Sequence, residues 1–176
     1  MPKEDLLYDG TQLTWYGHGN FNATSGLPGH QNAAEQSHMD EGPVPEGKYS
    51  FLVVIAKDAT MVAPEKLDIR EGIEHLPDKF RFRGVEYSNF AWGPDRVRLT
   101  TLQIDSPKNR HRGGFYLHDS TKGYSHGCIE VDPHFFLRLR EYAKLPLNKR
   151  SGRFSMILNV KYTSASGSTY GGTKVP

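Results

Sequence analysis

The alternation of apolar and polar positions predicts a chain built mainly from short β-strands. Stretches with the two-residue period of a half-buried strand, or with a β-branched run between turn residues, recur along the whole chain. They are 11–19, which runs into glycines, 49–56, 81–90, 97–104, 115–117 and 154–162. The run 115–117 leads directly to His118, so we expect this histidine at the end of a strand.

One segment has the period of an α-helix. In DPHFFLRLREYAK, Asp132 suits the N-cap, Pro133 suits the first helical position, and Pro146 ends the helix. The residues that share its apolar face are Phe135, Leu139, Tyr142 and Ala143. The sequence therefore predicts a mainly β domain, a sandwich or barrel with one or two helices.

The remaining segments look irregular. Residues 20–38 are rich in Gly, Asn, Ser and His and are interpreted as an extended loop. Residues 58–78 are charged and mixed, with a short helix expected after Pro64. The Ser-, Gly- and Thr-rich residues 163–176 are predicted to be a disordered tail. We expect a single domain over residues 1–162.

Composition and charge narrow the class of partner. The 18 glycines and 11 prolines among 176 residues are typical of a turn-rich soluble protein. The net charge is only +2, with no basic run interleaved with aromatics, so nucleic acid is not expected as a partner. The longest apolar run, 51–56, is far shorter than the roughly 20 residues that cross a bilayer, so membrane insertion is not expected. The opening residues 1–10 lack the apolar stretch of a secretory signal, which predicts a cytoplasmic start and export by another route.

The candidate chemistry is concentrated in HDSTKGYSHGC, residues 118–128. Its last residue, Cys128, is the only cysteine of the chain, so no internal disulfide forms and a free thiol remains. A catalytic thiol needs a base within hydrogen-bond reach and donors for the oxyanion. We expect His118 to be the base, Asp119 to orient its ring through its carboxylate or its backbone carbonyl, and the amides of Gly127 and Cys128 to stabilise the oxyanion.

Other residues near this segment are candidates for substrate contacts. His126 could bind a substrate carboxylate or steady the thiolate. Arg112 and Lys122 could bind the carboxylates of an anionic peptide, although a solvated basic turn is the plainer interpretation. The predicted substrate-binding residues are Tyr124, Arg112 and Lys122. The loop histidines His18, His30 and His38 are interpreted as solvated.

Two alternatives remain open for the cysteine. It could be an inert buried side chain, the commonest state of a lone cysteine, although the flanking histidines argue against this. It could also bind zinc together with His118 and His126, but the spacing suggests no fourth ligand.

The motif SHGC, preceded by a strand-end histidine, resembles the signature of the L,D-transpeptidase (YkuD-type) catalytic domain. The turn and strand GPVPEGKY and the strand GFYLH are also similar to that family, so the resemblance covers residues 42–162. It implies the fold of that domain and a site without metal or other cofactor. The residues at its motif positions are His118, Asp119, Ser125, His126, Gly127 and Cys128, with Cys128 as nucleophile and His118 as base.

The segment WYGHGNFNATSG and the compact size resemble the subgroup of L,D-transpeptidase-like toxins delivered by type VI secretion. This resemblance implies delivery to the periplasm of a target cell, with peptidoglycan stem peptides as substrate and an immunity protein and the secretion machinery as partners. The implied reaction is L,D-carboxypeptidase or L,D-transpeptidase chemistry, or D-amino-acid exchange, on tetrapeptide stems. A non-catalytic peptidoglycan- or partner-binding module and a zinc-dependent hydrolase are the alternatives.

The sequence departs from the family pattern at two places. The connection from His118 to Cys128 is shorter than in the housekeeping enzymes, which favours an open site and hydrolysis or exchange over crosslinking. Glu130 stands where the family usually has Asn or Arg. A carboxylate at this position could alter substrate binding or pair with Arg138.

Overall fold

The computed structural model describes residues 3–56, 72–82, 84–163 and 167–174. Within them the fold is mainly β with one α-helix, as the sequence predicts. The strands are β1 Leu6–Tyr8, β2 Gln12–Trp15, β3 Gly19–Ser25, β4 Gly47–Leu52, β5 Ile73–His75, β6 Lys79–Phe82, β7 Val85–Ser88, β8 Asp95–Arg98, β9 Thr100–Ile104, β10 Tyr116–His118, β11 Ile129–Val131 and β12 Ser155–Val160. The helix α1 covers Pro133–Lys144, and short 3-10 turns lie at Ala33–Glu35, Asn89–Ala91, Pro107–Asn109 and Leu147–Arg150.

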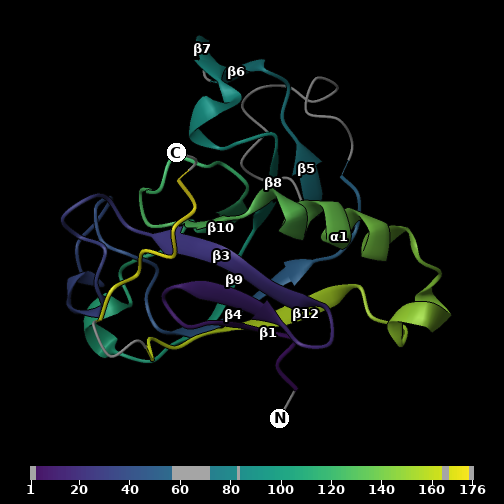
Figure 1. Ribbon diagram of the computed structural model, residues 1–176, viewed down its shortest axis with the longest axis horizontal. Helices are drawn as coiled ribbons and strands as arrows, with labels where there is room; N and C mark the ends of the chain where they lie inside the picture. Colours follow the sequence, from purple (N-terminus) through teal and green to yellow (C-terminus); the bar gives the residue numbers. More distant parts are fainter. Residues whose placement is uncertain (1–2, 57–71, 83, 164–166, 175–176) are drawn as a thin grey trace.

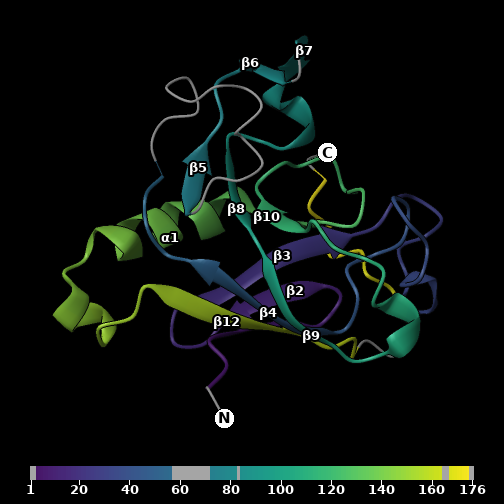
Figure 2. The same cartoon turned by 180° about the vertical axis from the view of Figure 1, so that it is seen from behind.

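Ten strands form one curled sheet in the order β5-β8-β10-β11-β3-β2-β1-β12-β4-β9. The curl follows from the chain path, because β8 lies near one end of this order and β9 at the other, yet only Leu99 separates them in sequence. The two ends of the sheet must therefore approach each other, and the strands wrap around a common interior (Figures 1 and 2). The separate β6–β7 hairpin projects from this body.

The helix α1 covers the interior on one side of the curled sheet (Figure 1). Asp132 caps it as predicted, since its side chain accepts a hydrogen bond from the His134 amide at 2.8 Å. Phe135 is fully buried, with its ring centroid 5.9 Å from that of Trp15 on β2 and 5.4 Å from that of Phe21 on β3. Edge-on aromatic contacts of this kind add to the burial of apolar area. They hold the segment after β11 rigidly against the sheet.

Two expectations about irregular segments are revised, and a third falls on residues that are not described. Residues 20–25, expected to begin a loop, belong to β3, whose partners are β2 and β11. Its alternate residues Phe21 and Ala23 are buried, so two apolar side chains suffice to place a polar strand in the sheet. The helix expected after Pro64 lies outside the described residues.

The predicted tail is not disordered at residues 167–174. Ser168 and Tyr170 form β-bridges with Asn32 and Thr24, and the Thr169 carbonyl accepts hydrogen bonds from the Thr24 and Tyr8 hydroxyls. The composition of this segment predicts disorder because ordering it costs conformational entropy. The hydrogen bonds that its threonines and backbone groups make with the sheet offset this cost. Figure 1 shows this segment running beside β3.

Truncating Phe135 to alanine should lower the free energy of unfolding by about 3–5 kcal/mol, because it leaves a cavity between α1 and the sheet. Leu137→Ala on the same helix is the control, since Leu137 is 59% exposed, and should change stability by less than about 0.5 kcal/mol. Urea unfolding followed by circular dichroism measures both. Equal effects of the two substitutions would contradict this packing of α1.

Candidate active site

A row of buried polar side chains crosses the sheet where the chemistry was predicted. Register pairs connect Glu74 on β5 to Arg96 on β8, Arg96 to His118 on β10, His118 to Glu130 on β11, and Glu130 to Thr24 on β3. None of the five is more than 2% exposed. Side chains alternate between faces along a strand, so these five residues lie on the face opposite the core residues Leu117 and Ile129.

His118 ends β10, and Cys128 immediately precedes β11, the parallel strand that pairs with β10. Cys128 is two residues from Glu130, the register partner of His118. Both side chains line one pocket, together with Phe90, Trp92, Lys122, Tyr124, Ser125 and His126.

A second pocket begins on the other side of the thiol. Trp92, His126 and Cys128 line both hollows, and the second is continued by Met39, Asp40, Arg112 and the turn at 113–115. Their volumes are about 220 and 480 Å³. Cys128, though only 9% exposed, therefore stands between two cavities that together have the size of a small-ligand or peptide site.

The turn that carries the cysteine requires glycine at position 127. Gly127 has φ +93°, and a Cβ there would lie 2.5 Å from Nη2 of Arg112. The next carbonyl, that of Cys128, accepts hydrogen bonds from the hydroxyls of Ser125 and Ser25. Ser125 therefore positions the backbone of the turn, which is the role the structure assigns to this motif residue.

Burial dominates the protonation of Cys128. It raises the pKa of the thiol to about 11, against the lowering effects of a hydrogen bond with the Tyr116 backbone and of the charges of Arg96, Lys122 and Arg112. The group is a neutral thiol at pH 7. Because a thiol is a weak nucleophile, catalysis here would need a base that removes its proton during the reaction.

His118 is neutral as well. Burial, then the charge of Lys122, lowers the pKa of its imidazole to about 3, while a hydrogen bond with the Trp92 backbone raises it and Arg96 lowers it further. A neutral ring has one nitrogen lone pair free to accept a proton. The pair is therefore a thiol and an imidazole at rest, rather than a thiolate and an imidazolium.

The side chain that contacts the His118 ring is Ser120, with its Oγ 3.2 Å from Nδ1. The Ser120 hydroxyl donates its single hydrogen to Glu130 and accepts from Nζ of Lys122 at 2.8 Å. The Ser120 oxygen can therefore only accept from the ring, and this hydrogen bond favours the neutral tautomer with its proton on Nδ1. In that tautomer Nε2 carries the lone pair.

Glu130 is the centre of this network and is completely buried. Its Oε1 accepts from the Gly123 amide at 2.7 Å and from the Thr173 hydroxyl at 2.5 Å, and its Oε2 accepts from the amide and ammonium groups of Lys122, both at 3.2 Å. A buried carboxylate is tolerated only when hydrogen bonds and an opposite charge satisfy it, as they do here. The predicted pairing of Glu130 with Arg138 is wrong, because Arg138 donates a hydrogen bond to the His18 carbonyl instead.

Asp119, expected to orient His118, has its carboxylate directed elsewhere. Oδ1 accepts from the Asp95 amide at 2.9 Å, and a Cβ at Gly93 would lie only 2.3 Å from this oxygen. Burial, more than the neighbouring Asp95, raises the pKa of this carboxyl to about 7. Ser120, supported by Glu130, takes the orienting position instead.

The predicted substrate-binding residues divide between the pocket and the scaffold. Tyr124 lines the pocket, with Nζ of Lys122 5.2 Å from its ring centroid. Arg112 is 7% exposed and donates to the carbonyls of Gln36, Gly42 and Pro43, so it holds the loop beside the site. His126 is exposed, lines both pockets and contacts the Asp40 carbonyl through Nδ1 at 3.1 Å.

Several functional positions escaped sequence reasoning. Ser120 lies inside the segment 118–128, but nothing in the sequence besides its closeness to His118 indicated a role. Thr173 was assigned to the predicted disordered tail. Trp92, which the sequence indicates as core or cleft-wall packing rather than a recognition platform, lines both pockets, and the guanidinium carbon of Arg96 lies 4.7 Å from its ring centroid.

The zinc alternative at Cys128 finds no support in the geometry. Among the described residues, the His, Cys, Asp and Glu ligand atoms that all lie within 4.8 Å of one another belong to His30, His38 and Glu41. His118, His126 and Cys128 do not form such a group.

Within the described parts of the chain, no helix is long and apolar enough to span a membrane. No protein-family model matches the sequence, and a search of curated proteins finds no similar one.

The pKa of Cys128 can be tested through its alkylation rate. Because burial raises the pKa of this thiol to about 11, the thiolate fraction and the rate with iodoacetamide should rise steadily from pH 7 to pH 10 without a plateau. N-acetylcysteine, with a pKa near 8.5, is the control and should level off within this range. A plateau that begins near pH 7 would reveal a preformed thiolate and imidazolium pair and would contradict this description.

Proposed function

We propose that the protein is a cysteine enzyme of the L,D-transpeptidase type that acts on the tetrapeptide stems of peptidoglycan. The observation that carries the proposal is that the side chains of His118, at the end of β10, and Cys128, directly before the paired strand β11, line a single pocket. The SHGC motif and its strand-end histidine supply the family resemblance. Both groups are neutral at pH 7, so the imidazole has a lone pair that can accept the thiol proton during the attack.

In the proposed reaction Nε2 of His118 accepts the thiol proton as the Cys128 sulfur attacks the carbonyl of the third, diamino-acid residue of the stem. The tetrahedral intermediate then collapses, the bond to the terminal D-alanine breaks, and the imidazolium returns its proton to the departing amine. A thioester remains on Cys128. Water that attacks this thioester gives a tripeptide, and an amine gives exchange or a crosslink.

The surroundings of Cys128 favour the negative charge that this reaction creates. Arg96, Lys122 and Arg112 each lower the pKa of the thiol, so each stabilises negative charge at the sulfur position. While His118 is protonated, the Ser120 oxygen and the Trp92 backbone are acceptors for the ring. The amides of Gly127 and Cys128 are the proposed donors to the oxyanion, on the turn that Ser125 holds in place.

The two cavities beside the sulfur suit an extended peptide. A chain that passes over Cys128 would place the residues before the scissile bond in one cavity and the leaving D-alanine in the other. His126 and Lys122, both on the pocket wall, are the proposed partners of the stem carboxylates, with Tyr124 and Trp92 as apolar walls. The connection between β10 and β11 is short, and on this ground we propose hydrolysis and exchange before crosslinking.

The biological setting follows from resemblance to the type VI secretion toxins. That resemblance implies a protein made in the bacterial cytoplasm and delivered into the periplasm of a target cell, with an immunity protein protecting the producer. Removal of terminal D-alanine would deprive that cell of donor stems for its own crosslinking.

Digestion of purified sacculi tests the proposed reaction. The wild-type protein should convert tetrapeptide muropeptides to tripeptides and release D-alanine, and in the presence of glycine should exchange the terminal residue. Cys128→Ala, which removes only a sulfur atom, should abolish these products, while Leu137→Ala on the exposed face of α1 should retain them. Chromatography of the muropeptides measures both. Unchanged muropeptides with folded wild-type protein, or full activity of Cys128→Ala, would refute the proposal.

A non-catalytic peptidoglycan-binding module is the second candidate, favoured by the raised pKa of Cys128. It predicts wild-type protein that binds sacculi without releasing D-alanine and without a mass increase at Cys128 after incubation with a carbapenem. The enzyme instead forms a covalent thioester with the opened carbapenem ring, so intact mass measurement separates the two candidates.

A further inference from the structure

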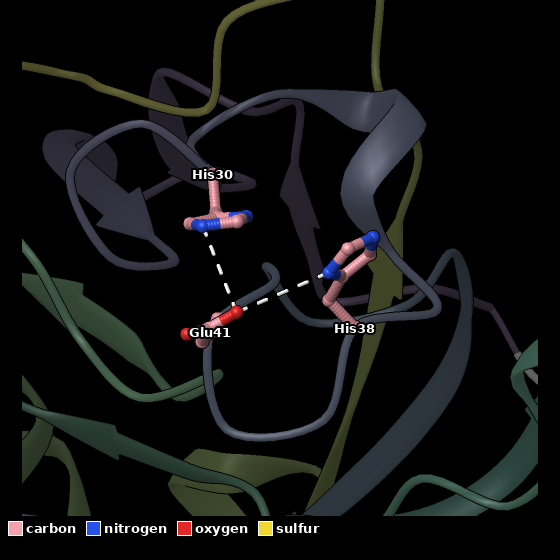
Figure 3. A group of neighbouring side chains, drawn as sticks. All are labelled: His30, His38 and Glu41. Atoms are coloured by element: carbon pink, nitrogen blue, oxygen red, sulfur yellow. Dashed lines mark ion pairs between the residues drawn. The ribbon is translucent and has the colours of Figure 1, made fainter.

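Two histidines and two glutamates form a closed group in the loop that precedes β4. The Glu35 carboxylate lies 3.0 Å from Nδ1 of His30 and 3.2 Å from Nε2 of His38. The Glu41 carboxylate lies 3.6 Å from Nε2 of His30 and 4.0 Å from Nδ1 of His38. Figure 3 shows one nitrogen of each ring directed at the Glu41 carboxylate. Each ring therefore has one nitrogen near Glu35 and the other near Glu41.

The spacing of three of these groups is close to that of a zinc site. Bonds of about 2.0–2.1 Å to a tetrahedral zinc ion place neighbouring ligand atoms about 3.3 Å apart. One ligand atom from each of His30, His38 and Glu41 lies within 4.8 Å of the others, and both glutamate distances are within 1 Å of the tetrahedral edge. Small side-chain rotations would close the remaining gap. A water molecule could complete the coordination from the solvent, because His38 and Glu41 are about half exposed.

Glu35 provides the second, independent observation. A histidine that binds metal through one nitrogen usually donates its other N–H to a carboxylate, which fixes the tautomer and the ring orientation. Glu35 lies at Nδ1 of His30 and Nε2 of His38, the nitrogens that point away from Glu41. A single carboxylate thus sets both rings so that their lone pairs face the Glu41 side.

We propose that His30, His38 and Glu41 bind one divalent transition-metal ion of the zinc type, with Glu35 as the positioning residue. The proposal does not depend on the chemistry proposed for Cys128, because none of these residues lines the pocket that contains His118. It revises the sequence-based interpretation of His30 and His38 as merely solvated.

The ion would fix one wall of the cleft. Met39 and Asp40, which line the second pocket, lie between His38 and Glu41 in the chain, and the Asp40 carbonyl contacts His126 at 3.1 Å. Arg112 holds the following residue, Gly42, from the other side. An ion that joins His38 to Glu41 would therefore restrict the short segment that faces His126 and Cys128.

Calorimetric titration of zinc chloride into untagged, chelator-treated protein tests the proposal. We expect one zinc ion per chain with a dissociation constant in the micromolar range or tighter. His38→Ala and Glu41→Gln should each weaken binding at least tenfold, and Glu35→Ala about tenfold to a hundredfold through its loss of ring positioning. His134→Ala is the matched control, because His134 also pairs with a carboxylate, Asp132, but stands outside the group. It should leave binding unchanged.

Two further results decide where the ion binds. Cys128→Ala should retain one zinc ion per chain, which excludes the thiol as the ligand, and zinc should slow hydrogen exchange of the amides of residues 26–43. Absence of zinc binding by the wild-type protein, with these four residues then forming an ion-pair network only, would overturn the proposal. Equal affinity in His38→Ala, or loss of binding in Cys128→Ala or His134→Ala, would overturn it as well.

Discussion

The burial of the Glu130 carboxylate is the constraint on which the rest of the site depends. A charge inside a protein must be satisfied by donors and by an opposite charge, and the donors here come from the β10–β11 connection and from residue 173 near the C-terminus. The ten residues 119–128 must therefore fold inward over one end of β11 and bring Ser120, Lys122 and Gly123 to the carboxylate. Parallel strands usually need a longer crossover. The hydrogen bonds from Ser120, Lys122 and Gly123 to the buried Glu130 carboxylate stabilise this short connection.

That attachment also determines the electrostatics of the reaction centre. Lys122 is held beside Glu130, and its charge lowers the pKa of both His118 and Cys128. For the histidine this effect adds to burial and keeps the ring neutral, whereas for the cysteine it opposes burial. The site thus holds a base in its active form and a nucleophile in its inactive form. Substrate binding, which excludes water and places the carbonyl beside the sulfur, would supply the remaining driving force.

The parts of this description that the sequence predicts are those with a local pattern. The helix cap at Asp132 and the strand ending at His118 follow from neighbouring residues, and the structure confirms them. The residues that were missed act over long distances in the chain. Thr24 and Thr173 are remote in sequence from Glu130 but adjacent to it across the sheet, and Ser120 became significant only once Glu130 was seen beside it. Asp119 was favoured because it follows His118, but successive side chains point to opposite faces, so adjacency argued against it.

The state of the His118 ring tests the central claim most directly. Nitrogen-15 NMR of labelled protein reports both the protonation and the tautomer of each imidazole. The account predicts a neutral His118 ring with its proton on Nδ1, unchanged from pH 8 down to about pH 4, because burial and Lys122 lower its pKa to about 3. A doubly protonated ring at pH 7 would have no lone pair to accept the thiol proton, and a proton on Nε2 would occupy the nitrogen proposed as the base; either result would contradict the account.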